Sequence, residues 1–355
     1  MYIHIFTKES GYSGGLLNLI GKYFNPSEHL FVFKKNRSSN VTYPENIRKR
    51  IIYAGNLNKL ILSFSVEFRS CRQLFFHYLP YGPSLFIWVL SPGLLRKSTW
   101  IIWGGDIYPA DNYKRNLFAF IYEVSRRMII KRIRRVAALI NEDYQIVKDR
   151  YRTDATFSQV LYPMPLNFSY LQTLKNSFDE KIDKIILLGN SASKTNNHID
   201  VLLMLAPISN KNIRIMCPLS YGGDRKYIDQ VTEQGERIFG DKFVPMFSFI
   251  PPDEYSRILA GVDILIMNQK RQQGLGNILP LLFLEKKVYL RKDTTSFRFL
   301  RKAGCTIFET EEIEKKPDSI LIPAKELLQH NPGMVHSLVS EENCMRLWKK
   351  LFDPE

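Results

Sequence analysis

Short apolar runs alternate with longer segments of helical periodicity along most of the chain. Helical spacing of apolar positions is found in segments such as Gly15–Tyr23, Leu57–Ser65 and Tyr113–Arg132. Near-continuous apolar strands that alternate with helices are typical of parallel sheets covered on both faces. In the first half, the runs that predict strands are Tyr2–Phe6, Leu30–Phe33, Arg50–Tyr53, Gln73–His77, Trp100–Trp103, Val136–Ile140 and Thr156–Leu161.

The alternation pauses around Tyr162–Lys181, where Pro163 and Pro165 interrupt it, and then begins again. The fold class predicted is α/β, with two Rossmann-like domains facing a cleft. The predicted boundaries are 1–165 and 182–330 for the domains, 166–181 for a linker and 331–355 for a C-terminal helix. The second series of predicted strands is Lys184–Leu188, Ile213–Cys217, Phe243–Met246, Asp263–Met267, Val288–Leu290 and Thr306–Phe308, and its predicted helices lie near Asn197–Ala206, Asp224–Phe239, Pro252–Ala260 and Leu275–Leu284.

The most apolar stretch, Leu74–Leu90, is interrupted by Pro80 and Pro83 and is shorter than a bilayer crossing requires. A buried strand, a turn and a helix explain it better than a membrane span. The N-terminus shows no basic region or cleavage motif, so no signal peptide is expected. The four cysteines are scattered, which predicts neither a disulfide framework nor a zinc site.

Positive charge is concentrated in the first half of the chain. Residues 1–170 contain 24 Lys and Arg against 11 Asp and Glu, a net charge of +13, whereas residues 171–355 contain 26 against 24, a net charge of +2. Such a field favours an anionic partner, which could be a membrane surface, a lipid diphosphate or nucleic acid. Solubility alone would not require this asymmetry.

The first candidate site segment follows the predicted strand Trp100–Trp103. Gly104 and Gly105 allow close approach of the backbone to a ligand, and Asp106 comes next. At the carboxyl end of a strand, this carboxylate could accept the proton of an acceptor hydroxyl. The same Gly-Asp pattern is also common in tight turns, which leaves a structural role open.

Two further candidate segments follow strands in the second half. Leu188–His198 offers small hydroxyl and amide side chains that suit an anion, although it could equally be an N-terminal helix cap. Arg271–Asn277 combines a guanidinium with a bare glycine-rich helix start, which could face a diphosphate leaving group without a metal ion. A Gly-x-Gly loop alone can also reflect tight packing.

A basic and apolar segment, Arg126–Arg135, completes the set of candidates. Its cations would attract anionic headgroups at a membrane surface, or would compensate the dipole at a helix C-terminus. The cations expected to meet the membrane or the acceptor are Arg126, Arg127, Lys131, Arg132, Arg134 and Arg135.

Taken in order, these segments resemble the 4-acetamido-4,6-dideoxygalactose (Fuc4NAc) transferases of enterobacterial common antigen synthesis. The resemblance covers roughly residues 73–290 and departs at Ala192–Thr195 and at Gly105. The matching pieces are Phe75–His77, Ile102–Tyr108, Leu188–Ser191 with Asn197–Ile199, Pro218 with Tyr221, and Arg271–Gly276.

The resemblance implies a GT-B-like glycosyltransferase. Its donor would be a dTDP-linked deoxyamino sugar and its acceptor an undecaprenyl-diphosphate-linked saccharide, used peripherally at the cytoplasmic face of the inner membrane. Neither a metal nor another cofactor is expected. If the transfer inverts the anomeric configuration, His77 or Asp106 is the candidate base on the acceptor side, whereas in a retaining transfer Asp106 would only position the acceptor. The residues expected to bind the donor are Asn190, Ser191, His198, Tyr221, Arg271, Gln272, Gln273, Gly274, Gly276 and Asn277.

Three other interpretations remain open at this point. A transferase of the same fold could use a UDP-sugar and an unrelated acceptor. A nucleic-acid-binding protein would fit the sequence pI of 9.5, but no helix-turn-helix, RNP or zinc pattern is found. Because a fold does not prove turnover, an inactive glycan-binding relative is the third possibility. The main prediction excludes a nucleic-acid partner.

Overall fold

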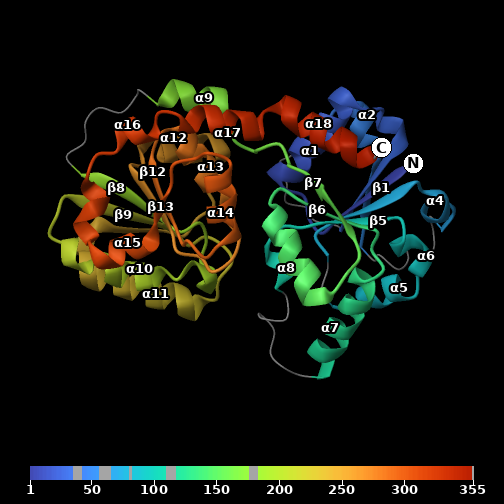
Figure 1. Cartoon of the computed structure of the whole chain (residues 1–355), viewed down its shortest axis with the longest axis horizontal. Helices are drawn as coiled ribbons and strands as arrows, with labels where there is room; N and C mark the ends of the chain where they lie inside the picture. The colour runs from blue at the N-terminus through green and yellow to red at the C-terminus, as the bar shows by residue number, and fades with distance from the viewer. Residues whose placement is uncertain (35–41, 56–64, 80–81, 109–116, 176–182, 354–355) are drawn as a thin grey trace. The chain divides into compact units, whose positions relative to one another are not determined.

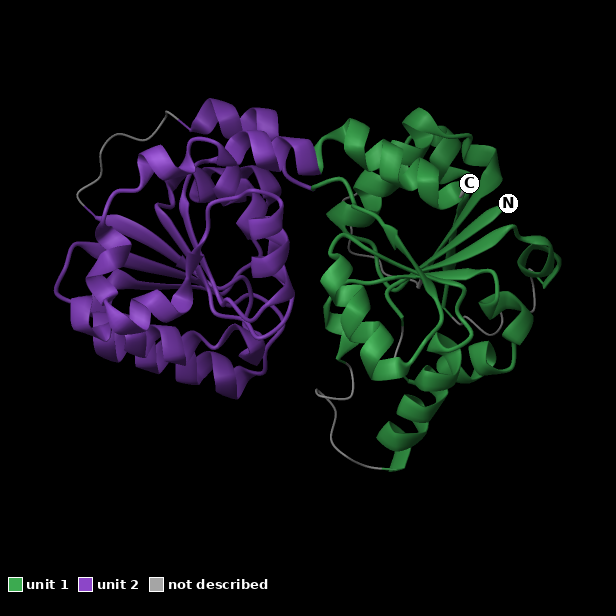
Figure 2. Cartoon of the chain, in the orientation of Figure 1, with its two compact units in different colours: residues 1–164, 339–355 green, residues 165–338 purple. Residues whose placement is uncertain are grey.

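The structure is a computed structural model that describes the whole chain except residues 35–41, 56–64, 80–81, 109–116, 176–182 and 354–355. The predicted helix Leu57–Ser65 therefore falls almost entirely outside the described residues. The chain forms two compact units, shown in Figure 2. Unit 1 comprises residues 1–164 and 339–355, and unit 2 comprises residues 165–338.

Unit 1 is built on a seven-stranded sheet with the order β3-β2-β1-β4-β5-β6-β7, in which every pair is parallel. The strands are β1 (Tyr2–Phe6), β2 (His29–Lys34), β3 (Ile51–Ala54), β4 (Gln73–His77), β5 (Ser98–Ile101), β6 (Arg135–Ala138) and β7 (Thr156–Gln159). The helices are α1 (Gly11–Tyr23), α2 (Glu45–Arg48), α4 (Ser65–Ser70), α5 (Leu85–Val89), α6 (Pro92–Leu95), α7 (Leu117–Ile130), α8 (Asn141–Tyr151) and α18 (Glu341–Phe352).

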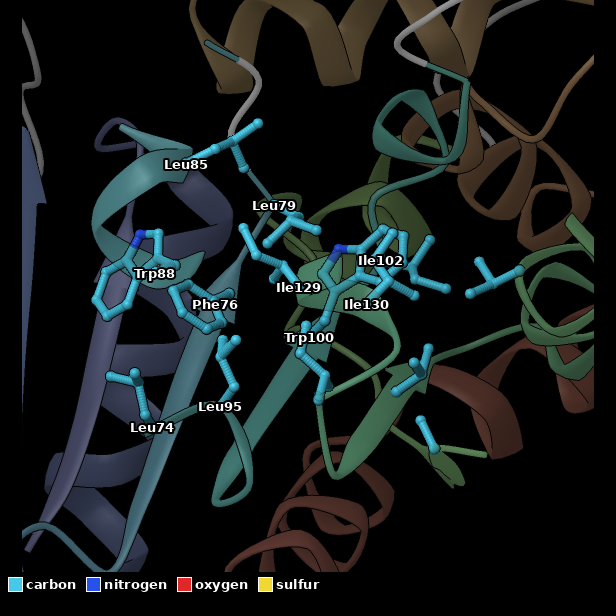
Figure 3. Close-up of a cluster of buried hydrophobic side chains, with 14 of the residues drawn as sticks. Leu74, Phe76, Leu79, Leu85, Trp88, Leu95, Trp100, Ile102, Ile129 and Ile130 are labelled. Atoms are coloured by element: carbon cyan, nitrogen blue, oxygen red, sulfur yellow. The ribbon is translucent and has the colours of Figure 1, made fainter. Parts of the chain in front are cut away.

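The sheet of unit 1 carries a hydrophobic core on each face, because successive strand residues point in opposite directions. On β4, Leu74 and Phe76 belong to one core, which Figure 3 shows packed with Trp88 and Trp100. Phe75 belongs to the other core. The apolar stretch Leu74–Leu90 thus contains β4 and α5, as predicted. No helix in the described ranges is both long and apolar enough to span a bilayer.

The C-terminal region forms two helices where a single one was expected at 331–355. They are α17 (Asn331–Val339) and α18, and they are separated at Ser340, whose hydroxyl accepts a hydrogen bond from the backbone N–H of Asn343 at 3.2 Å. A serine cap of this kind starts a new helix. The indole of Trp348 on α18 donates to the carbonyl of Leu161 at 2.8 Å, so α18 completes the second core of unit 1.

Unit 2 contains a six-stranded sheet with the order β10-β9-β8-β11-β12-β13, again parallel throughout (Figure 1). The expected linker 166–181 contains helix α9, which packs on α12 within this unit. The strands are β8 (Lys184–Leu188), β9 (Ile213–Pro218), β10 (Phe243–Met246), β11 (Ile264–Met267), β12 (Lys287–Leu290) and β13 (Phe308–Glu309). The remaining helices of eight or more residues are α10 (His198–Leu205), α11 (Arg225–Phe239), α12 (Pro252–Gly261), α13 (Leu275–Phe283) and α14 (Thr295–Lys302), and the shorter ones are α9 (Phe168–Leu174), α15 (Thr310–Lys315) and α16 (Lys325–Leu328).

Both sheets are doubly wound, as predicted, and each has one position where the direction of winding reverses. In unit 1 this switch lies between β1 and β4, and in unit 2 it lies between β8 and β11. Ligands of open parallel sheets bind beyond the carboxyl ends of the strands at such a switch. The loops that follow these four strands are therefore where a site is expected.

Candidate active site

Three loops of unit 2 meet at the carboxyl edge of its sheet. They follow β8, β9 and β11, which are neighbouring strands around the switch. The backbone N–H of Ala192 donates to the carbonyl of Tyr221 at 2.7 Å, which joins the first loop to the second. The amide of Asn197 donates to the carbonyl of Asn268 at 2.7 Å, which joins the first loop to the third.

Asn190 is the side chain that ties these loops together. Its amide nitrogen donates to the hydroxyl of Tyr221 at 3.3 Å, and its amide oxygen accepts from the side chain of Gln273 at 3.3 Å. Gln273 in turn accepts from the hydroxyl of Thr195 at 2.8 Å. Three predicted donor-binding residues, distant in sequence, therefore form one hydrogen-bonded set.

Gly274 lies beneath Asn190 in a conformation that favours glycine. Its φ is +73°, and an added Cβ would come within 2.1 Å of the Met267 methyl and 3.4 Å of the Asn190 amide carbon. Gly274 is also the N-cap of α13 and offers no side chain to the first turn. Backbone N–H groups at a helix start lack partners within the helix, so this turn can face an anion.

The first turn of α13 also carries a buried amide. Asn277 is 6% exposed, and its oxygen accepts from the hydroxyl of Tyr255 at 2.9 Å. Among the described residues, no hydrogen-bond partner is found for the side-chain nitrogens of Asn277 and Asn268 or for the side-chain oxygen of Gln269. Buried polar atoms are nearly always paired in folded proteins, so these atoms point to a bound ligand or ordered water.

Asn268 and Gln269 were not predicted, although both directly follow the apolar strand β11, which is the signal that could have identified them. Arg271, Gln272 and Gly276 lie in the loop after β11 or in the first turn of α13, and all three are partly exposed. The ring of Tyr221 is 60% exposed, so one face can receive a planar group.

Ser191 and His198 are buried and support the loop that follows β8. Asn196, fully buried, donates to the carbonyl of Ser191 at 2.8 Å and to its hydroxyl at 3.3 Å. His198 pairs with the hydroxyl of Tyr227 at 3.2 Å, and burial lowers the pKa of His198 to about 4. This neutral imidazole lies against Gly189, where a Cβ would be 2.7 Å from Nε2. Both predicted residues therefore shape the loop.

In unit 1, Asp106 is fully enclosed by the fold. Its carboxylate accepts hydrogen bonds from the indole of Trp100 at 2.7 Å, from the backbone of Trp103 at 2.9 Å and from the backbone of Leu79 at 3.2 Å. Burial raises the pKa of Asp106, while the Arg126 guanidinium and these donors act in the opposite direction. With no exposed surface, the carboxylate has no access to an acceptor hydroxyl. We assign it a structural role instead of the expected catalytic one.

His77, the other candidate base, belongs to a buried chain of imidazoles. His4 lies 2.9 Å from His77 and 3.0 Å from His29 between ring nitrogens, and the other ring nitrogen of His77 pairs with the hydroxyl of Tyr162. Burial lowers the pKa of all three histidines, that of His29 to about 3. His77 is thus held neutral inside the core, away from solvent.

A carboxylate that was not predicted lies at the switch of unit 1. Glu9 is partly exposed in the loop between β1 and α1, and it accepts from the hydroxyls of Tyr53 at 2.6 Å and Tyr43 at 3.3 Å. Burial and the neighbouring carboxylate raise the pKa of Tyr53 to about 12, so its hydroxyl stays protonated. The sequence signal that could have identified Glu9 is its position just after the first strand, at the edge of the sheet where ligands bind.

The basic segment separates into buried and exposed cations. Arg126 is fully buried and donates to the carbonyls of Leu79 and Asp106. Arg135 is 8% exposed and donates to the carbonyl of Leu351 at 3.3 Å. These two cations hold the fold together and do not fit the expected membrane contact. The predicted cations that are exposed are Arg127, Lys131, Arg132 and Arg134.

A family model described as 4-alpha-L-fucosyltransferase, glycosyl transferase group 56, matches residues 19–329. Among solved structures, a glycosyltransferase from Rickettsia africae is similar, with 14% identity, a TM-score of 0.69 and coverage of 100% of this chain and 99% of that one. HepE of Anabaena in complex with UDP-glucose has 10% identity and a TM-score of 0.71, with 99% of each chain covered.

A third similar structure is WaaG, a glycosyltransferase involved in lipopolysaccharide biosynthesis. It has 10% identity, a TM-score of 0.63 and coverage of 99% of this chain and 98% of that one. At these identities the likeness concerns the fold. Together with the two parallel sheets, it confirms the prediction of two Rossmann-like domains of the GT-B type.

Asp106→Asn is expected to lower the unfolding free energy of unit 1 by about 1–3 kcal/mol, because an amide nitrogen would then face one of the three N–H donors. All four tryptophans lie in unit 1, so urea unfolding followed by tryptophan fluorescence reports on this unit. Asp149→Asn, at an exposed position of α8, is the control. Unchanged stability with lost turnover would restore the catalytic role.

Acid is expected to destabilise unit 1 through its buried histidines. Their folded pKa values lie below the unfolded value of about 6.5, so stability is fully present above that pH and is lost as the pH falls. The unfolding free energy should drop by up to about 1.4 kcal/mol per pH unit for each histidine. Fluorescence-detected urea unfolding between about pH 7.5 and pH 5 measures this. His29→Gln should reduce the slope, and a flat profile would contradict the account.

Proposed function

Because its model matches residues 19–329, the chain belongs to the 4-alpha-L-fucosyltransferase family, glycosyl transferase group 56, and we propose that it transfers a Fuc4NAc-like deoxyamino sugar. The protein is thus a glycosyltransferase enzyme of the GT-B type. The proposed donor is a dTDP-sugar and the proposed acceptor is an undecaprenyl-diphosphate-linked saccharide. The observation that carries the proposal is the set of loops around Asn190 and the bare start of α13 in unit 2.

In the proposed donor complex, the diphosphate lies at the first turn of α13. The N–H groups of Leu275 and Gly276 and the guanidinium of Arg271 face it, and the unpartnered amide nitrogen of Asn277 supplies a further donor. The exposed ring of Tyr221 stacks on the base. These groups stabilise the charge that develops on the leaving dTDP, and we propose that no metal ion is needed.

On the acceptor side we propose that Glu9 replaces Asp106 as the base of an inverting transfer. The acceptor O–H bond breaks as its proton passes to the Glu9 carboxylate, and the oxygen forms a bond to the anomeric carbon. The bond from that carbon to the diphosphate breaks, and its electron pair leaves with dTDP. Tyr43 and Tyr53 orient the carboxylate through their hydrogen bonds.

We propose that the enzyme works peripherally at the cytoplasmic face of the inner membrane, in the synthesis of a surface polysaccharide such as enterobacterial common antigen, O-antigen or capsule. The net charge of +13 on residues 1–170 supports an anionic surface as partner. WaaG, which has a similar fold, takes part in lipopolysaccharide biosynthesis.

Asn190→Ala is expected to weaken dTDP binding about tenfold or more, because it breaks the hydrogen bonds that join the loops. Gly274→Ala should have a larger effect, since a Cβ clashes with Met267 at a positive φ. Titration calorimetry with dTDP and UDP measures both variants. Asn212→Ala, at an exposed position before β9, is the control. Unchanged affinity in Asn190→Ala contradicts the site, and tighter binding of UDP contradicts the donor.

Glu9→Gln is expected to lower kcat about 10²- to 10⁴-fold while the Kd for dTDP stays the same, because an amide cannot take the acceptor proton. Transfer from dTDP-sugars to a short lipid-diphosphate saccharide, detected by mass, gives kcat. Glu28→Gln, an exposed carboxylate of the same unit, is the control. If Glu9→Gln retains wild-type kcat, Glu9 is not the base.

A further inference from the structure

The N-terminal end of α7 exposes large apolar side chains to solvent. Leu117, Phe118 and Phe120 are 69%, 66% and 67% exposed, and Val124 in the next turn is 40% exposed. Phe86 of α5, itself 42% exposed, lies beside the helix, with its ring centroid 5.9 Å from that of Tyr122. We call these five residues, Phe86, Leu117, Phe118, Phe120 and Val124, the α7 face. An exposed apolar patch of this kind marks an interaction site.

The opposite end of α7 is anchored in the core of unit 1. Ile129 and Ile130 are fully buried in the core of Figure 3, and Arg126 is bound to two backbone carbonyls. Figure 1 shows the other end of α7 projecting beyond the neighbouring helices of this unit. The α7 face therefore sits on a helix whose other end is held by the core of unit 1.

Cations adjoin the α7 face on its anchored side. Arg127, Lys131 and Arg132 are all exposed, and Glu123 is the one acidic residue within 117–135. Glu123 is already paired with Arg127 at 3.0 Å. Aromatic and aliphatic tips next to cations match the interface of an anionic bilayer, where rings enter the acyl boundary and cations remain among the headgroups.

We propose that the α7 face docks unit 1 onto an anionic lipid bilayer by inserting Phe118 and Phe120 at the interface. With 14 residues, α7 is about 21 Å long and too short to cross the bilayer, and because Phe118 and Phe120 lie about 200° apart around the helix, both enter the interface at its projecting N-terminal end (Figure 1). A second copy of this chain fits less well, since two strongly basic units would be brought together. The inference rests on the proposed function in that the lipid-linked acceptor would be reached from this surface.

The test is flotation of the full chain with phosphatidylglycerol-containing vesicles and with phosphatidylcholine vesicles. The double variant Phe118→Ser and Phe120→Ser should lower the partition coefficient at least about tenfold. The matched control is Phe249→Ser, which removes an 81% exposed ring from unit 2 and should have no effect. Lys131→Gln with Arg132→Gln should weaken binding about tenfold or more to the anionic vesicles only.

Unchanged partition of the double phenylalanine variant, or an equal loss in Phe249→Ser, would overturn the proposal. Sedimentation equilibrium tests the alternative occupant, a second copy of this chain. A dimer that dissociates in the double variant would assign the α7 face to that second copy. Transfer to a water-soluble saccharide is measured in parallel. Transfer without vesicle binding overturns the docking alone, and vesicle binding without transfer overturns the proposed function alone.

Discussion

Parallel strand pairing is the constraint on which both halves of this enzyme depend. Because every strand of a sheet runs in the same direction, all of its outgoing loops emerge at one edge, however far apart they are in sequence. In unit 2, this brings the loops after β8, β9 and β11 within hydrogen-bonding distance of one another. In unit 1, the same geometry places Glu9, which follows β1, at the edge reached by the ends of β4 and β5.

At this edge of the sheet in unit 2, the backbone packs closely against side chains at two glycines. At Gly274 an added Cβ would lie 2.1 Å from the Met267 methyl, and at Gly189 it would lie 2.7 Å from Nε2 of His198. Each glycine thus leaves room for a neighbouring side chain in the space that its own Cβ would need. The first turn of α13 is therefore closely packed, which suits its proposed role of holding a diphosphate while charge develops on it.

The sequence allowed the strands and the winding to be predicted, because continuous apolar runs are local patterns, and its glycine-rich helix start located the loops that are proposed to bind the donor. The role of Asp106 was harder to predict, since a Gly-Asp pair after a strand has the same local sequence in a tight turn and in a catalytic site. Its burial depends on Leu79, 27 residues away. His77 likewise depends on His4 and Tyr162, 73 and 85 residues away. The burial of Arg126 could have been predicted, because Arg126 precedes the inward-facing Ile129 and Ile130 by one helical turn.

The return of α18 to unit 1 has a consequence for synthesis on the ribosome. Unit 2 is continuous from residue 165 to residue 338, so it can fold as soon as that stretch is released. Unit 1 lacks Trp348 and Leu351 until residues 339–355 have been made, and the sheet face that they cover stays open to water meanwhile. The first half of the chain to be made is thus the last to mature, with an uncovered apolar surface that chaperones or aggregation can reach in the interval.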